Sequence, residues 1–411
     1  MVWLAALTVT AFLLRLISGL AKGPDFVGNG YEFYADIART FWDSNGLCYA
    51  PNYGCAVRVP LYPVLVAPFL AMGTAYPWLI VLKAAVGAMQ PLLAYQLGSL
   101  LFTRRIAMVA ALGAALNPYA VVHGPSFQET VIFNALISFT VVLLLHAVRR
   151  NDLAISLAAG LALALATLTS VRLALFVPIA VAWMMAPRQG AAVATRVIHG
   201  VCVALPLVLL VGGWMTRNAR VVGAPVLTTE FGLSLWLANN PETTAFLPGR
   251  SIDLVEEPAW LGLPEYDRES IAALSDSAVA EDRYYARLAI DYIADNPWAT
   301  MGSALRKVAL SFAGWMSPAR DWPVQIGYLV IFGPLHVIGL AGLWRQRYAG
   351  SHHLLVTLLV IAFAITTALF WAHTSHGSFL HVFMIVYAAS MIPPALLERL
   401  ARRVADASLA Y

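Results

Sequence analysis

Apolar and polar residues alternate in long blocks along this chain of 411 residues. A helix that crosses a bilayer needs about 20 mostly apolar residues. Ten apolar stretches approach this length: 2–20, 77–101, 106–122, 127–147, 153–170, 172–187, 197–216, 324–344, 353–371 and 379–397. Two long polar segments interrupt them, 21–76 and 218–322. The pattern predicts an all-α polytopic membrane protein with about ten transmembrane helices.

Composition supports this class, and the positions of arginine predict an orientation. Hydrophobic residues make up 60% of the chain and charged residues only 12%, which excludes an ordinary soluble globule. Alternate short loops carry the arginines Arg104, Arg105, Arg149, Arg150, Arg188, Arg196, Arg345, Arg347, Arg399, Arg402 and Arg403. By the positive-inside rule these loops face the cytoplasm, so both termini lie inside and both long loops outside.

The formal net charge of +4 therefore reflects topology. No basic patch interleaved with aromatic residues indicates nucleic-acid binding. Only three of the 26 basic residues are lysines, which suggests a GC-rich bacterial genome. We expect a multi-pass protein of the bacterial inner membrane, with its active face in the periplasm.

The two polar segments divide the chain into three regions. These are an N-terminal transmembrane core, 1–217, a large outer loop, 218–322, and C-terminal transmembrane helices with a cytoplasmic tail, 323–411. The large loop carries 14 of the 22 acidic residues. Its segment Ser277–Ile293 shows helical spacing, and Asn296-Pro297 ends that helix. The loop is too small for an independent catalytic domain, and we interpret it as a lid or acceptor platform.

Cys48 and Cys55 lie in the first outer loop, with the turn-forming Asn52-Tyr53-Gly54 between them. An oxidising outer compartment favours a disulfide here, and the alternative is two unpaired thiols. Cys202 falls within an apolar stretch and is interpreted as a packing residue.

A short amphipathic helix is predicted in the first outer loop from Tyr31 to Trp42, lying in the membrane interface. Glu32 and Asp36 share one face of it, and Arg39 lies one turn beyond Asp36. A solvated acidic face with an Asp36–Arg39 ion pair explains Asp36 well. It explains Glu32 less well, because Glu32 stands among aromatic residues. A carboxylate in that position is a candidate general base.

The loop continues through Arg58 into Val64–Met72, an apolar segment too short to span the membrane. A guanidinium beside such a segment can hold a lipid phosphate with two hydrogen bonds. On position alone, snorkelling to phospholipid is the simpler interpretation.

Charged residues near the predicted spans also need an explanation. Lys83 is expected to face the bundle interior. It can neutralise Glu129, form part of a donor site or snorkel outward, and all three roles are open. Arg172, between two spans, is interpreted as an anchor or ion-pair partner. Arg320 is a further outer-face base, for which an ion pair or headgroup contact is the simpler role.

Five motifs, taken in order, resemble the polytopic GT-C glycosyltransferases, which include protein O-mannosyltransferases and lipid A aminoarabinose transferases. They are Gly30-Tyr-Glu-Phe-Tyr-Ala-Asp-Ile-Ala-Arg39, Arg58-Val-Pro-Leu-Tyr-Pro63, Asn117-Pro118 with Glu129, Phe231–Pro241 and Ala280–Pro297. The resemblance covers about 25–325. It implies a GT-C fold with interfacial helices in the first outer loop and a partly helical outer loop after the seventh span.

The resemblance also implies an inverting glycosyltransferase, a hexosyl- or pentosyltransferase. Such an enzyme moves a monosaccharide from a polyprenyl-phosphate donor to a glycan, lipid or protein at the outer face. Relatives use an acidic base in the first outer loop. Their usual aspartate position is occupied here by Gly30 or Asn29, so the role passes to Glu32. Asp25, Asp36 and Glu129 are alternative acids.

For the lipid phosphate, the resemblance implies Arg58, with Lys83 and Arg320 as further candidates. Near the last helix, where relatives carry an Arg-Tyr pair, this chain has His376-Gly-Ser-Phe-Leu-His381. A lipid phosphate is a good leaving group, so transfer requires a base and cations but no strong general acid. The sequence has no Asp-x-Asp metal motif, P-loop or Gly-x-Ser-x-Gly elbow. We therefore expect neither a cofactor nor a divalent metal.

Two other classes compete with this interpretation. A transporter or lipid flippase also carries buried charges, but it predicts internal repeats and charges at the membrane midplane, which the sequence does not show. The second alternative is a non-catalytic membrane assembly subunit, in which Glu32 would be only a solvated carboxylate. The sugar, the acceptor and the oligomeric state stay open.

Overall fold

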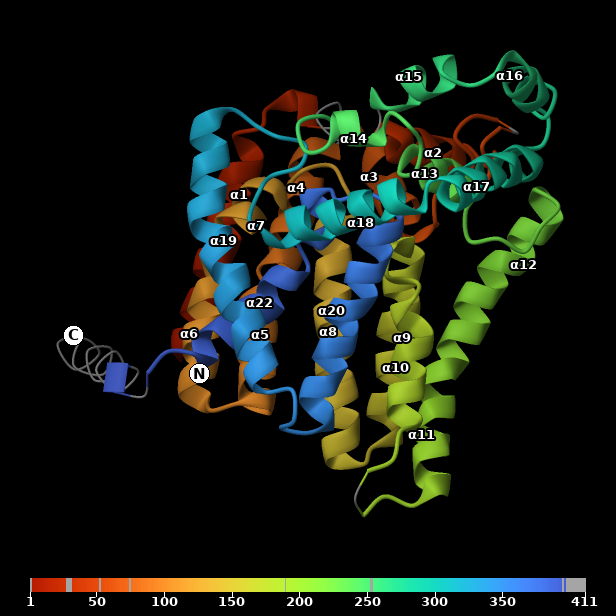
Figure 1. Cartoon of the computed structure of the whole chain (residues 1–411). Coiled ribbons are helices and arrows are strands. Elements are labelled where there is room, and N and C mark those ends of the chain that lie inside the picture. The colour runs from red at the N-terminus through yellow and green to blue at the C-terminus, as the bar shows by residue number, and fades with distance from the viewer. Residues whose placement is uncertain are drawn as a thin grey trace.

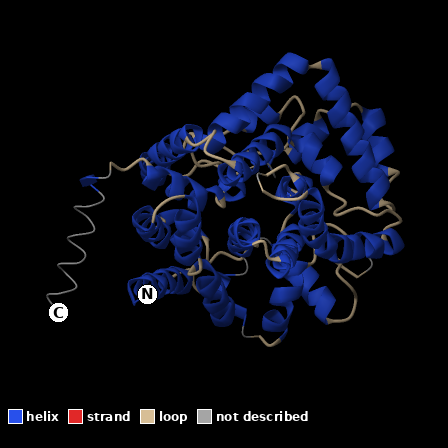
Figure 2. Cartoon of the chain, turned by 90° about the horizontal axis from the view of Figure 1, so that it is seen from below, coloured by secondary structure: helices blue, strands red, loops and turns tan. Residues whose placement is uncertain are grey.

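The computed structural model describes residues 2–26, 32–51, 53–73, 75–188, 190–251, 254–393 and 395–396. Figure 2 shows helices throughout this portion of the chain. The described residues contain one isolated β-bridge, between Ala50 and Tyr53. The predicted all-α class is confirmed.

The helices of the N-terminal half are numbered in chain order (Figure 1). They are α1 (Val2–Leu20), η1 (Pro24–Phe26), α2 (Glu32–Trp42), α3 (Leu61–Ala71), α4 (Ala75–Gly87), α5 (Gln90–Leu101), α6 (Arg104–Ala115), α7 (Pro118–His123), α8 (Thr130–Arg150), α9 (Leu153–Thr169), η2 (Val171–Leu173), α10 (Phe176–Met185), α11 (Val193–Pro206), η3 (Leu207–Val211) and α12 (Gly212–Val221). The helix predicted from Tyr31 to Trp42 is present as α2, with Tyr31 outside the described residues, and its position in the membrane interface stays a prediction.

The large loop and the C-terminal region are also helical. They contain α13 (Phe231–Leu237), α14 (Thr243–Phe246), α15 (Glu256–Leu261), α16 (Glu265–Ala272), α17 (Ala278–Asp295), α18 (Pro297–Phe312), α19 (Trp322–Arg345), α20 (Ser351–Leu369), α21 (Thr374–Gly377) and α22 (Leu380–Ser390). The helix predicted at 277–293 is confirmed as α17. The hydroxyl of Ser277 accepts a hydrogen bond from the backbone N–H of Ala280 at its start.

Among the described residues, six helical runs are long and apolar enough to cross a membrane. They are Val2–Leu20, Tyr76–Leu101, Thr130–Arg150, Val193–Val221, Trp322–Arg345 and Ser351–Leu369. Four further apolar helices are shorter, namely α3, α9, α10 and α22. The predicted stretch 106–122 is divided, because Asn117 caps α7 and Pro118 begins it. The structure therefore supports a polytopic fold, and the count of ten spans stays a prediction.

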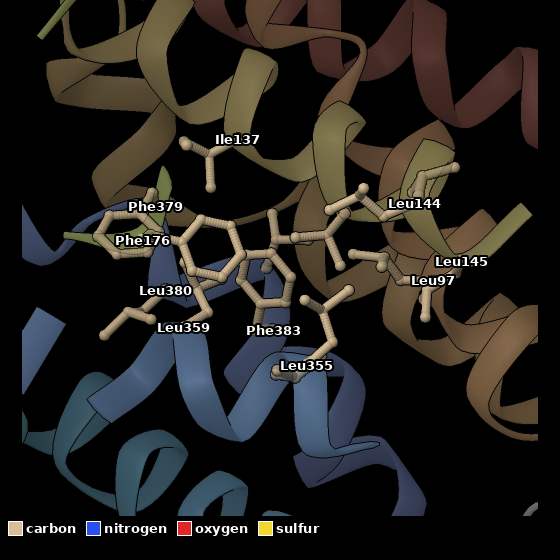
Figure 3. Close-up of a cluster of buried hydrophobic side chains, with 14 of the residues drawn as sticks. Leu97, Ile137, Leu144, Leu145, Phe176, Leu355, Leu359, Phe379, Leu380 and Phe383 are labelled. Carbon is tan, nitrogen blue, oxygen red and sulfur yellow. The ribbon is translucent and has the colours of Figure 1, made fainter. Parts of the chain in front are cut away.

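A large apolar core joins α5, α8, α10, α20 and α22. Figure 3 shows side chains of these helices meeting, among them Leu97, Leu145, Phe176, Leu359 and Phe383. All five are at most 1% exposed. Without a hydrophobic effect between helices in lipid, such packing depends on close van der Waals contact. This core fixes the bundle beneath the outer loops.

Small residues let several helices approach closely. A Cβ added to Gly98 of α5 would lie 2.6 Å from Cα of Ala107 in α6. One added to Gly160 of α9 would lie 2.3 Å from the carbonyl oxygen of Val203 in α11. In both cases backbone occupies the space, as is typical of membrane helices joined by small residues. Larger side chains at these glycines would separate the pairs.

A second, smaller layer forms from α13 to α18 of the large loop. Figure 1 shows these helices gathered over one end of the bundle, around α2 and α3. Their own apolar cluster includes Trp236, Phe246, Ile271 and Tyr285, and it reaches Trp371 beyond α20. The large loop is therefore packed on the transmembrane core.

Lys307 of α18 is fully buried in this layer, and its ammonium donates a hydrogen bond of 3.2 Å to the carbonyl of Ala238. Burial lowers the pKa of this ammonium from 10.5 to about 7. Between these values the unfolded chain binds a proton that the folded chain does not. Folding stability is then expected to rise with pH, by up to about 1.4 kcal/mol per pH unit.

We expect Lys307→Met to remove this pH dependence, because methionine has a similar length and no charge. The measurement is thermal unfolding of the detergent-solubilised protein at pH values from 7 to 10, for the wild type and the variant. An equal rise of the unfolding temperature in both proteins would show that other groups cause it.

Candidate functional site

The start of α2 lies against the first turn of α3. Tyr34 and Tyr62 are both buried, and their rings meet edge to face with centroids 4.9 Å apart. Glu32 is the first residue of α2, but its side chain lies outside the described portion of the structure. Its neighbour Phe33 lies under the guanidinium of Arg58, which is 5.4 Å from the ring centroid. The helix start is therefore positioned between Arg58 and Tyr62.

Lys83 reaches the same tyrosine from α4. Its ammonium donates a hydrogen bond of 3.2 Å to the Tyr62 hydroxyl and another to the carbonyl of Gln128. Lys83 is only 1% exposed, so it does not snorkel to the surface. Glu129 directly follows Gln128, but its carboxylate pairs with a different cation and not with Lys83.

That cation is Arg172, in the short helix η2 between α9 and α10. Arg172 donates to the Glu129 carboxylate, and both side chains are largely buried, 12% and 7% exposed. It also donates to the hydroxyl of Ser170 at 2.9 Å and to the carbonyl of Ser375 at 3.1 Å. The interpretation of Arg172 as an ion-pair partner is confirmed. The arginine links three separate segments of the chain.

Arg58 forms the second ion pair, with Glu230 just before α13. Both side chains are 23% exposed, so solvent reaches this pair. Two further bonds hold the first outer loop here: the Thr229 N–H of the large loop donates to the carbonyl of Ala56 at 2.9 Å, and Arg217 of α12 donates to the carbonyl of Cys55. The two outer loops thus meet at Arg58.

His376 of α21 lies close enough to Arg58 and Arg172 for their charges to affect its pKa. Burial lowers its pKa well below the ordinary value, and the nearby positive charges of Arg172 and Arg58 lower it further. Its imidazole is therefore neutral at neutral pH. His376, Arg58 and Arg172 belong to three separate segments, and the structure gathers them at one end of the bundle.

The other predicted site residues have different surroundings. Asp36 pairs with Arg39 at 3.1 Å on the exposed side of α2, as the simpler interpretation predicted. Asp25 is exposed in η1. The backbone N–H of Arg320 donates to Gln325 at 3.3 Å. Burial, together with the nearby charges of Lys22 and Arg320, lowers the pKa of His123 to about 4.

Cys48 and Cys55 form a disulfide in the first outer loop. Its position holds the loop beside Arg217, which binds the Cys55 carbonyl. Among the described residues, no group of three His, Cys, Asp or Glu side chains is arranged to hold a metal ion.

Sequence reasoning found Arg58, Lys83 and Glu129 but missed Glu230, Tyr62 and the place of His376. Glu230 is one of 14 acids in the large loop, and nothing in its local sequence distinguishes it. Its role depends on a partner 172 residues away. An isolated charge between apolar stretches, as at Arg172, is the kind of signal that does point to a buried ion pair.

This arrangement can hold an anion. Arg58, Lys83 and Arg172 supply three cations at this end of the bundle, and two of them are already matched by carboxylates. Burial strengthens the attraction between such cations and an incoming phosphate.

Comparisons with known proteins concern the family and the fold of the chain. Residues 58–214 match the family described as dolichyl-phosphate-mannose-protein mannosyltransferase. No curated protein sequence matches the chain significantly.

The Archaeoglobus fulgidus oligosaccharyltransferase, solved with Zn and sulfate, aligns with a TM-score of 0.57 and 17% identity over 99% of this chain and 51% of its own. The same organism's AglB, solved with an inhibitory peptide and a dolichol-phosphate, aligns with a TM-score of 0.50 and 15% identity over 94% and 50%. This chain thus spans about half the length of these relatives. ArnT from Cupriavidus metallidurans, bound to undecaprenyl phosphate, has a TM-score of only 0.39, at 15% identity over 94% and 77%.

The family match begins at Arg58 and covers the segments that supply Lys83, Glu129 and Arg172. The structural likeness extends over nearly the whole chain and establishes the fold. The chain is a multi-pass membrane protein that shares the fold of the Archaeoglobus fulgidus oligosaccharyltransferase, and its residues 58–214 match the dolichyl-phosphate-mannose-protein mannosyltransferase family.

Proposed function

We propose that this protein is a glycosyltransferase that moves a monosaccharide from a polyprenyl-phosphate donor to a glycan, lipid or protein acceptor. The observation that carries the proposal is that Arg58 and Lys83 reach the start of α2, while Arg172 lies at the same end of the bundle, near His376. The reaction is inverting, with one direct attack on the anomeric carbon. It takes place at the periplasmic face of a bacterial inner membrane, without a cofactor or divalent metal.

The lipid phosphate is proposed to bind Arg58 first. Arg58 is the most exposed of the three cations, and its guanidinium can bind phosphate with two parallel hydrogen bonds. Lys83 and Arg172 then stabilise the charge that grows on the phosphate as the glycosidic bond breaks. The AglB structure, which contains a dolichol-phosphate, supports this class of donor.

Glu32 is proposed to accept the proton of the acceptor hydroxyl. The acceptor oxygen attacks the anomeric carbon, the bond to the phosphate oxygen breaks, and the lipid phosphate leaves as an anion. The leaving group needs no proton, because its charge is held by the three cations. The transmembrane core 1–217 provides the donor site, 218–322 covers it, and 323–411 contributes His376.

The ion pair Arg58–Glu230 provides the test of this proposal, because replacing Arg58 and replacing Glu230 should have opposite effects on use of the donor. Arg58→Ala is expected to abolish most use of the donor, and Arg58→Lys to restore it only in part, since lysine keeps the charge but loses the two-pronged geometry. Glu230→Gln frees Arg58 and is expected to keep or improve donor binding. The measurement is transfer of a labelled sugar by purified protein over a range of donor concentrations.

Equal loss in Arg58→Ala and Glu230→Gln would mean that the pair only joins the two outer loops. Transfer at the wild-type rate in Arg58→Ala would make Arg58 a headgroup anchor. Absence of transfer by the wild type from every polyprenyl-phosphate sugar offered would contradict the glycosyltransferase proposal.

A further inference from the structure

Helix α18 exposes an apolar face. Trp298, Met301 and Leu305 are 79%, 47% and 66% exposed, and their spacing of three and four residues places them on one side of the helix. The opposite side is buried, with Ser303 and Lys307 only 7% and 0% exposed. Three large apolar side chains on one exposed face require a partner or an apolar surrounding.

The position of α18 relative to the spans indicates what covers this exposed apolar face. At its C-terminal end, the ring of Phe312 lies 5.9 Å from Phe363 of α20 and 6.2 Å from His336 of α19. His336 is 14 residues from the first residue of α19, which corresponds to about 21 Å along a helix. Figure 1 shows α18 running across the bundle below the end of α19 where that helix begins.

The turn after α18 confirms this depth. A Cβ on Gly314 would lie 2.2 Å from the backbone nitrogen of Gly333, near the middle of α19. Met316 and Ser317 in the same turn are buried, 4% and 3% exposed. Irregular backbone at membrane depth is tolerated where protein covers it, and the protein covers this turn.

We propose that α18 is an interfacial helix whose Trp298–Met301–Leu305 face lies among the lipids of the outer leaflet. The helix ends at the depth of the middle of α19, and side chains of α19 and α20 such as Ile326, Val330 and Leu369 are also exposed, at 52%, 64% and 47%. Bilayer lipid is therefore the occupant that the depth of α18 favours. The inference does not rest on the proposed sugar transfer.

The polar groups of α18 agree with this placement. Arg306 donates hydrogen bonds to the carbonyls of Thr244 at 3.4 Å and Leu247 at 2.7 Å. Lys307 binds Ala238 in the interior. The cations of the helix are thus directed toward the large loop, and Trp298 near the helix start is suited to the headgroup level.

The test measures the depth of α18 in a bilayer. Cys202 is replaced by alanine, and a single cysteine is introduced as Trp298→Cys or Leu305→Cys and labelled with an environment-sensitive fluorophore. The control is Tyr266→Cys, because Tyr266 is 75% exposed and lies on α16, a helix that Figure 1 shows away from the spans. The labelled proteins are reconstituted into vesicles of phosphatidylethanolamine and phosphatidylglycerol.

Probes at 298 and 305 are expected to be quenched by lipids spin-labelled near the top of the acyl chain, and to be several-fold less sensitive to aqueous iodide than the probe at 266. Iodide quenching equal to that at 266 would overturn the proposal. Shielding from both quenchers would also overturn it, because it would show that protein covers this face.

Discussion

Glu32→Gln is expected to lower the rate of sugar transfer by about 10²–10⁴-fold, the usual effect of removing a positioned base. Glutamine keeps the shape of the side chain but cannot take the proton of the acceptor hydroxyl. The start of α2 supports this role, since Phe33 and Tyr34, which follow Glu32, contact Arg58 and Tyr62. The measurement is turnover of purified enzyme at saturating donor.

Donor binding provides the control for this variant. Glu32→Gln should bind the polyprenyl-phosphate sugar with wild-type affinity, because the cations are unchanged. Asp25→Asn, Asp36→Asn and Glu129→Gln complete the set of acids. Near-normal turnover in Glu32→Gln beside an inactive member of this set would assign the base to that other residue.

Breaking the buried pair Glu129–Arg172 is expected to cost roughly 3–5 kcal/mol of folding stability. Glu129→Gln leaves the guanidinium without its carboxylate, and Arg172→Gln leaves the carboxylate without its cation. The double variant removes both charges, so its loss should be smaller than the sum of the single losses. Unfolding by denaturant in detergent measures the loss of stability in the two single variants and the double variant. The loss in the double variant minus the sum of the two single losses gives the coupling energy.

The exposed pair Asp36–Arg39 serves as a matched control. Its side chains are 33% and 57% exposed, and breaking such a pair costs about 1 kcal/mol or less. Single variants at Glu129 and Arg172 that lose no more than these controls would mean that water reaches the buried pair. A stable Glu129→Gln protein with no transfer would instead favour a catalytic role for Glu129.

The sequence predicted the fold class well because a membrane span leaves a long apolar block. It predicted the lengths less well. The Asn117-Pro118 break inside 106–122 was visible as a helix start, yet apolar residues on both sides made the stretch look continuous. Similarly, α18 was counted with the polar loop, because the average charge of 218–322 hides one apolar helix face.

The candidate site was predictable where a residue is unusual for its own surroundings. Lys83 in an apolar stretch and Arg58 before one drew attention for that reason. The partners were not predictable, because pairing between distant segments leaves no local pattern. Glu230 shows this most clearly, as one acid among many in the large loop until the fold brings it to Arg58.

The contacts that assemble the site also set an order for its biosynthesis. Arg58 meets its partner only after another 172 residues have been made, and Arg172 meets Ser375 only after another 203. A nascent chain that has inserted its first helices therefore holds Arg58 without Glu230, and later Arg172 without the carbonyl of Ser375. The candidate site can be complete only when nearly the whole chain has entered the membrane, so fragments that end before α21 should lack part of it.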